Sequence, residues 1–187
     1  MSSGLSKIED FCPISENEAL CVNGPSYTEL TEIVKVRYND KLELSEPETI
    51  KTGSYLRLGN YYDGELCYSD VYDVYVGDEK ICEGIQPYAF DLGIVYQNKG
   101  SIYLNREKII IPQNDYKVCG RPTEYNNQIY YETRWDIAPK GWEIWRYDIE
   151  SNTNEFMIKG ANPYVYKNTL YYSLWKGSEF DLCSYRI

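Results

Sequence analysis

The residues best suited to chemistry are tryptophans, arginines and a tyrosine in three segments that we expect to form loops. These segments are 23–28, 134–142 and 174–178. The candidate binding residues in them are Tyr27, Arg134, Trp135, Trp142 and Trp175. Exposed aromatic rings beside a guanidinium form hot spots in protein interfaces and also stacking platforms for sugars. The alternative is that these large rings pack between neighbouring sheets.

Arg121 is a further candidate binding residue, because it could contact an anion or a carboxylate. The alternative is an ion pair with a neighbouring connection. The chain contains no His, the commonest general base and the commonest transition-metal ligand. Its six Cys include no Cys-x-x-Cys pair. We therefore predict no metal site and no cofactor, and any catalysis would depend on carboxylates, Tyr, Lys or Cys.

The charge of the chain restricts its partners. Asp and Glu outnumber Lys and Arg by 29 to 19, which gives a net charge of −10. This excess argues against general nucleic-acid binding and against docking on anionic membranes. Residues 1–51 hold ten acidic and five basic residues, and they form either a patch for a basic partner or a solvated face. The glutamates that could form this patch are Glu16, Glu18, Glu29, Glu32, Glu43, Glu46 and Glu48.

The cellular location is predicted from what the sequence lacks. The first residues show no apolar segment of a signal peptide, and no run reaches the length of a membrane span. We therefore expect an intracellular protein with reduced thiols, and a role as a component of a virion or another complex stays open.

A fivefold internal repeat indicates the elements that position these residues. Its anchors are Pro13, Gly59, Pro87, Pro122 and Pro163. Seven residues after each anchor stands Leu or Ile, and nine residues after it stands Val or Tyr. Turn-forming residues such as Asp63-Gly64 and Asn126-Asn127 lie between. A strand–turn–strand unit of this size cannot bury its apolar face alone, so neighbouring units must stack.

Radial stacking of such units predicts an all-β, five-bladed β-propeller. We expect one domain over 1–187. We also expect the stretch 108–118 to form one strand of the third blade. The predicted blades are 12–52, 58–84, 86–118, 121–160 and 162–187. The last blade lacks an outer strand, so we predict that residues 5–10 pair with it and close the ring. A β-sandwich or barrel is the alternative.

Two copies of the repeat carry a family resemblance. The segments NPYVYKNTLYY and RPTEYNNQIYY resemble inner-strand hairpins of the furanosidase-type glycoside hydrolase propellers. The resemblance implies an acidic nucleophile or base immediately before the anchor. The residues at that position here are Cys12, Leu58, Gln86, Arg121 and Asn162. None is a carboxylate, so lectin-like and other non-catalytic propellers resemble the chain more closely.

These observations favour a non-catalytic propeller that binds a macromolecule, with a protein partner ahead of a glycan. Three alternatives stay open. They are a lectin-like glycan binder, a glycoside-processing enzyme, and an acidic inhibitor of a nucleic-acid-binding protein.

Overall fold

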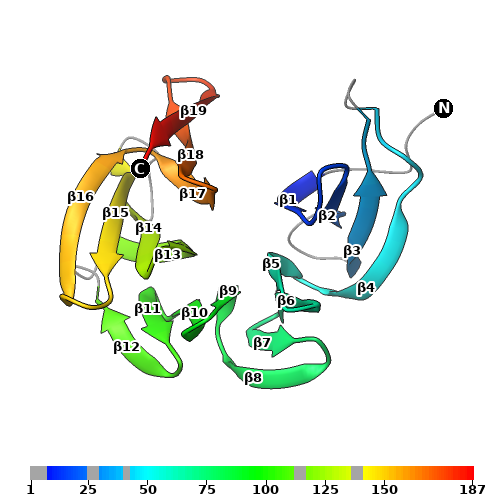
Figure 1. The fold of residues 1–187 in the computed structure, drawn as a ribbon, viewed down its shortest axis with the longest axis horizontal. Coiled ribbons are helices and arrows are strands. Elements are labelled where there is room, and N and C mark those ends of the chain that lie inside the picture. Colours follow the sequence, from blue (N-terminus) through cyan, green and yellow to red (C-terminus); the bar gives the residue numbers. More distant parts are fainter. Residues whose placement is uncertain (1–7, 25–29, 40–42, 112–116, 136–140) are drawn as a thin grey trace. The chain divides into compact units, whose positions relative to one another are not determined.

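The chain is an all-β protein built of five consecutive antiparallel sheets (Figure 1). The computed structural model describes residues 8–24, 30–39, 43–111, 117–135 and 141–187. The nineteen strands within these ranges form meanders in which neighbours along the chain pair with each other. These meanders are the blades of a five-bladed β-propeller, which confirms the predicted fold class.

The bounds of the strands follow the chain order. The first sheet contains β1 (Ile8–Pro13), β2 (Glu18–Asn23), β3 (Leu30–Arg37) and β4 (Glu48–Ser54). The second contains β5 (Arg57–Tyr62), β6 (Glu65–Asp70), β7 (Asp73–Val76) and β8 (Glu79–Glu83). The third contains β9 (Ile85–Phe90), β10 (Gly93–Asn98), β11 (Ser101–Leu104) and β12 (Glu107–Ile110). The fourth contains β13 (Lys117–Tyr125), β14 (Gln128–Trp135), β15 (Glu143–Asp148) and β16 (Thr153–Lys159). The fifth contains β17 (Ala161–Tyr166), β18 (Thr169–Trp175) and β19 (Phe180–Arg186).

The chain divides into two compact units, Met1–Ala89 and Phe90–Ile187. They differ in charge. The first unit holds 17 acidic and seven basic residues, a net charge of −10, and the second holds 12 of each, a net charge of zero. The single domain over 1–187 stays a prediction.

The apolar positions of the sequence repeat are the buried positions of the sheets. The residues nine places after the five anchors are all buried, namely Val22, Tyr68, Tyr96, Tyr131 and Tyr172. The hairpin turns fall where the turn residues predict them. Asp63-Gly64 and Asn126-Asn127 have positive φ at both positions, which is the type I′ geometry that matches the twist of two flanking strands.

The anchors themselves mark β-bulges. The pairing register shifts between Gly120 and Thr123 in β13, and again between Ala161 and Tyr164 in β17. The residue just before Pro122 is Arg121 with φ of 46°, and the residue before Pro163 is Asn162 with φ of 53°. A bulge bends its strand and re-aims the side chain at the bulge.

The first sheet corrects the predicted register. Its bulge falls between Ile8 and Phe11, so the position equivalent to the other anchors is Asp10 rather than Pro13. Cys12 pairs with Leu20. The equivalent pair in the fourth sheet is Glu124 with Ile129, and Glu124 stands two places after the anchor Pro122. The hairpin between β1 and β2 is three residues longer than the hairpin between β13 and β14. This insertion shifted the alignment of the first copy of the sequence repeat. The residue before the first anchor is therefore Glu9, a carboxylate, and not Cys12.

Two predicted strands are also corrected. Ile8, Glu9 and Asp10 lie in β1, which pairs with β2, so the described part of segment 5–10 belongs to the first sheet. Within the described residues the last sheet has three strands. The predicted strand 108–118 divides into the end of β12 and the start of β13. The apolar pattern alone did not distinguish one strand from two.

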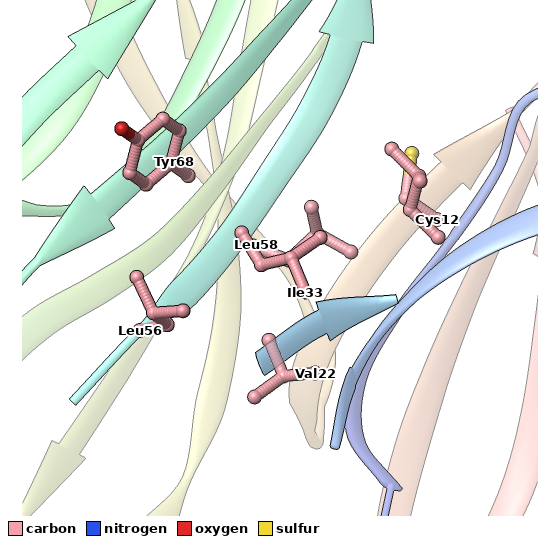
Figure 2. Packing of buried hydrophobic residues seen from close by; sticks show 7 residues of the cluster. Cys12, Val22, Ile33, Leu56, Leu58 and Tyr68 are labelled. Atoms are coloured by element: carbon pink, nitrogen blue, oxygen red, sulfur yellow. The ribbon is translucent and has the colours of Figure 1, made fainter. Parts of the chain in front are cut away.

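The core of the first unit lies between its first two sheets. Figure 2 shows Cys12, Val22 and Ile33 from the first sheet facing Leu58 and Tyr68 from the second. These side chains are nearly or fully buried, and Tyr68 stacks on Tyr75 with ring centroids 5.2 Å apart. Burial of such side chains is the main favourable contribution to the stability of the unit.

Polar side chains join successive blades of the first unit. The amide of Asn60 donates to the carbonyl oxygen of Ala89 at 2.8 Å and accepts from its N–H at 2.8 Å. Asp10 accepts a hydrogen bond from the backbone N–H of Leu58 at 3.1 Å. At Gly59 an added Cβ would lie 2.1 Å from the carbonyl oxygen of Pro87. The glycine anchor therefore permits a close approach of β5 and β9 that no other residue allows.

The core of the second unit packs the fourth and fifth sheets together. Tyr130 and Ile144 contribute from the fourth sheet, and Val165, Leu170 and Tyr172 from the fifth. The fourth and fifth sheets therefore share one hydrophobic core.

Candidate functional site

The structure brings three of the predicted site residues into one cluster. Trp142 lies directly before β15, Trp175 ends β18, and Arg134 lies near the end of β14. Phe180, the first residue of β19, lies between the two tryptophans. Its ring centroid is 5.7 Å from that of Trp142 and 4.9 Å from that of Trp175. The guanidinium carbon of Arg134 lies 5.9 Å from the Trp142 ring centroid.

Two predicted site residues cannot be placed in this cluster. Tyr27 lies outside the described residues. Trp135 ends β14, but its side chain is also outside what the structure describes. Trp145, which the sequence suggested as a core residue, is half-buried and packs edge-on against Phe156.

The aromatic residues line a cleft between the fourth and fifth sheets, which we call the aromatic cleft. Its volume is about 300 Å³, the lower end of the range for ligand pockets. Its lining residues are Trp142, Lys159, Gly160, Ala161, Ser173, Leu174, Trp175 and Phe180. Phe180 is 44% exposed, so its ring is available to a ligand.

Local backbone geometry explains why these residues meet. Lys176 N–H donates to the carbonyl oxygen of Glu179 at 2.9 Å, and this turn sets Phe180 directly opposite Trp175. Gly160 N–H donates to the carbonyl oxygen of Trp142 at 3.0 Å. An added Cβ at Gly160 would lie 2.6 Å from Cδ2 of Tyr172, so only glycine fits against this buried ring.

A buried carboxylate lies beside the aromatic cleft. Glu132 is 1% exposed, and its Oε2 accepts a hydrogen bond from the backbone N–H of Asn162 at 2.7 Å. Its Oε1 lies 4.0 Å from Nε of Arg121 and 4.0 Å from Nε of Arg134. Arg121 thus lies at ion-pair distance from a carboxylate of its own sheet. A buried carboxylate needs such partners, because leaving it unpaired is costly.

Sequence reasoning missed Phe180, Lys159 and Glu132. Phe180 could have been found by pairing it with Trp175 across the short 176–179 turn. Lys159 reaches the cleft only because β16 ends there. Glu132 alternates in β14 with Gln128 and Arg134, so the sequence pattern gave no signal for its burial.

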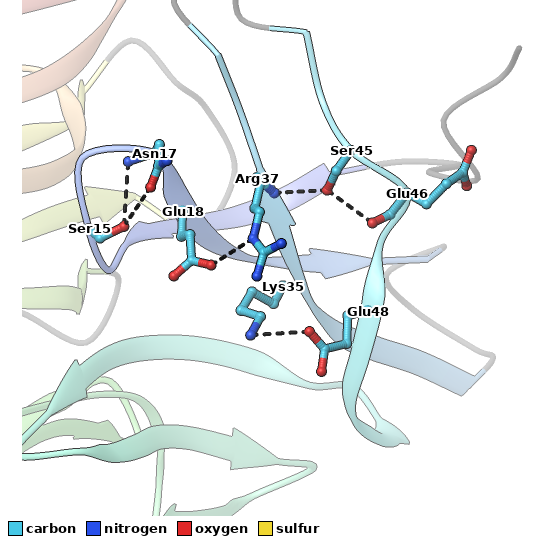
Figure 3. A network of polar contacts seen from close by, with 8 residues as sticks. All are labelled: Ser15, Asn17, Glu18, Lys35, Arg37, Ser45, Glu46 and Glu48. Atoms are coloured by element: carbon cyan, nitrogen blue, oxygen red, sulfur yellow. Dashed lines mark hydrogen bonds and ion pairs between the residues drawn. The ribbon is translucent and has the colours of Figure 1, made fainter.

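The acidic N-terminal segment is partly neutralised by its own strands (Figure 3). Arg37 Nε lies 2.9 Å from Oε1 of Glu18, and Lys35 Nζ lies 3.1 Å from Oε2 of Glu48. Glu43 accepts from the side-chain amide of Asn39. Exposed ion pairs of this kind contribute little stability but reduce the charge presented to a partner.

In the described ranges, no three or more Cys, Asp and Glu side chains lie close enough together to hold a metal ion. The same ranges contain no helix with the length and apolar character needed to cross a membrane. None of the six cysteines forms a disulfide bond.

The sequence matches no known family model and no characterised protein. Among solved structures it is similar to the one described as the crystal structure of puromycin hydrolase, with 10% sequence identity and a TM-score of 0.49. The similarity covers 87% of this chain and 33% of that chain, so this protein spans about one third of its length.

Proposed function

We propose that the protein is a binding module whose aromatic cleft takes an apolar anchor side chain of a protein partner. The observation that carries the proposal is the contact of Trp142, Trp175 and Phe180 around one cleft of about 300 Å³. Tryptophan, tyrosine and arginine dominate hot spots, and their energy is concentrated where a partner side chain fills a pocket. Arg134 stacks on one of these rings.

Phe180→Ala tests this proposal against a matched control. Peptides displayed on phage are selected for binding to the unmodified protein, and their affinities are measured for each variant. Tyr185→Ala is the control, because Tyr185 is an aromatic residue of the same strand with a similar exposure of 47% and does not line the cleft. We expect Phe180→Ala to weaken binding at least tenfold, which corresponds to about 1.4 kcal/mol, and Tyr185→Ala to have no effect. Equal effects of the two variants would overturn the proposal.

A lectin-like function uses the same rings, because aromatic faces stack on sugars. A glycan array distinguishes the two functions. If no peptide can be selected, and if the protein binds glycans and loses that binding in Phe180→Ala, the ligand of the cleft is a glycan and not a protein.

The segregation of charge favours a second candidate, an acidic inhibitor of a nucleic-acid-binding protein. All of the net charge of −10 belongs to Met1–Ala89. A panel of basic DNA-binding domains, each bound to a labelled duplex, tests this function by competition. Displacement of duplex at physiological salt supports it, and no displacement from any domain contradicts it.

The glycoside-processing alternative remains a hypothesis with a corrected premise. Glu9 stands before the first anchor, so one of the five matched positions does carry a carboxylate. Glycoside hydrolysis requires two carboxyl groups across the scissile bond. Release of reducing sugar from a panel of aryl furanosides, abolished in Glu9→Gln, is the result that would establish it.

A further inference from the structure

We propose that the aromatic cleft selects a peptide segment in which an aromatic residue is followed by Asp or Glu. This inference rests on the proposed function and names the chemistry of the partner. It starts from Lys159, which is the one charged residue among the described residues that line the cleft. Lys159 ends β16 with an exposed side chain.

Within the described residues Lys159 makes no ion pair, unlike several other lysines. Lys35, Lys51 and Lys80 each lie within 3.2 Å of a carboxylate oxygen. The residue paired with Lys159 across the strands is Glu143. Its carboxylate instead accepts from the indole N–H of Trp145 at 3.1 Å and from the hydroxyl of Thr133 at 3.5 Å. The ammonium group of Lys159 is thus left for a ligand.

The other groups beside the cleft favour the same sign of charge. The guanidinium groups of Arg121 and Arg134 lie there, each with Nε 4.0 Å from Oε1 of Glu132. Glu179 and Asp181 flank Phe180 but do not line the cleft. Interactions between exposed charges weaken with distance in water and salt, so the lining residue dominates.

A cationic ligand fits this site poorly. Aromatic rings can hold a cation, but Arg134 already lies over Trp142, and Lys159 would repel a second positive charge. A neutral aromatic side chain fills the cleft, and a carboxylate on the next residue reaches the ammonium group at its mouth. An aromatic side chain and an adjacent carboxylate together match what the lining offers.

Three blocked dipeptides test the charge preference, namely acetyl-Trp-Glu-amide, acetyl-Trp-Gln-amide and acetyl-Trp-Lys-amide. Binding is followed by NMR through the indole N–H resonance of Trp142 in ¹⁵N-labelled protein, assigned with Trp142→Phe. We expect the Glu peptide to bind about two- to fivefold more tightly than the Gln peptide, and the Lys peptide to bind most weakly. Added salt should reduce the difference.

Lys159→Gln should remove the preference of the Glu peptide over the Gln peptide and leave the Gln peptide unaffected. The matched control is Lys108→Gln, because Lys108 is also an exposed strand lysine of the second unit and lies over Tyr103 instead of the cleft. Equal binding of the three peptides, or a preference for Lys, would overturn the charge inference and leave the proposed function intact. If none of them shifts the Trp142 resonance, the cleft takes no aromatic anchor, and both proposals fail.

Discussion

In each of the two units a carboxylate joins one blade to the next by accepting a hydrogen bond from the backbone N–H directly before the next anchor, but the surroundings of the two carboxylates differ. In the first unit Asp10 accepts from the N–H of Leu58, which stands directly before the anchor Gly59. In the second unit Glu132 accepts from the N–H of Asn162, which stands directly before the anchor Pro163. Asn60 reinforces the first joint with two more backbone hydrogen bonds, whereas two arginines surround the second.

We call these two carboxylate–backbone contacts the joints of the first and second unit. The joint of the first unit is only structural, whereas the joint of the second unit also positions a residue of the aromatic cleft. The side-chain amide of Asn60 donates one hydrogen bond to the backbone of Ala89 and accepts one from it. Glu132 instead holds Arg134, and Arg134 stacks on a ring of the aromatic cleft. Changes to the joint of the second unit should therefore alter both stability and binding, and changes to the joint of the first unit only stability.

Alkaline pH should produce the largest difference between the units. Burial raises the pKa of Cys21 from 9.0 to about 11 and that of Cys67 from 9.0 to about 12, and both thiols lie in the first unit. Above pH 9 the unfolded chain loses these protons while the folded chain keeps them, so stability falls as pH rises. The expected loss is about 1.4 kcal/mol per pH unit for each thiol, and about 5 kcal/mol in total by pH 11.

Two probes follow this loss separately. All four tryptophans belong to the second unit, so tryptophan fluorescence reports on that unit and circular dichroism on both. Burial also raises the pKa values of Tyr130, Tyr131, Tyr147 and Tyr172 in the second unit, but the ordinary value of a tyrosine is 10.0, so their effect begins about one pH unit later. The decline between pH 9 and 10 should vanish in the Cys21→Ala, Cys67→Ala double variant. A decline unchanged in that variant would contradict the assignment to the thiols.

Asn60→Ala should be the most damaging single substitution at either joint. It removes two hydrogen bonds and leaves the buried N–H and carbonyl groups of Ala89 unpaired, so we expect a loss of about 3 kcal/mol in unfolding free energy. Urea denaturation measures it. Asn17→Ala is the control, because the exposed amide of Asn17 bonds only to Ser15. Similar losses of unfolding free energy in the two variants would show that the hydrogen bonds of Asn60 to Ala89 contribute no more stability than an exposed contact does.

Glu132→Ala should lower the unfolding free energy by about 2 kcal/mol, because it leaves two arginines without their shared anion. Glu132→Gln should lose less, since its amide oxygen can still accept from Asn162. Both variants should also weaken the peptides selected on the aromatic cleft, measured by titration of the folded protein. Asp10→Ala should leave peptide affinity unchanged, and an equal effect on binding would erase the distinction between the joints.

Glu18→Gln should have the smallest effect, below about 0.5 kcal/mol. It removes an exposed ion pair to Arg37, and such pairs contribute little. The same urea measurement is expected to give this result, and a loss above about 1 kcal/mol would show that ion pairing in the acidic unit is structural.

The fold could be predicted from the sequence because residues of similar type recur at positions that are buried in every sheet. Tyr68, Tyr96, Tyr131 and Tyr172 recur at one position because each fills the same place in its sheet. The register of the first sheet was wrong because Pro13 matched the other anchors by identity. The bulge is defined by pairing, and pairing placed Asp10 there.

The candidate site was predicted in part for a similar reason. Trp142, Trp175 and Arg134 were identifiable because large and charged residues in loops between β-strands stand out in a sequence. Phe180 and Lys159 join them only through the pairing of β18 with β19 and the end of β16. Such proximity depends on tertiary geometry that residue type does not encode.

The left-handed residue before each proline anchor has an evolutionary consequence. In Gln86, Arg121 and Asn162 the backbone adopts the same conformation, with φ between 46° and 53°, although their side chains differ in length and charge. A position with fixed backbone and variable side chain lets a lineage exchange recognition groups there while each blade keeps its shape. Diversification of such a repeat would therefore be concentrated at these residues, and an alignment of divergent copies should show them changing faster than the tyrosines nine places beyond the anchors.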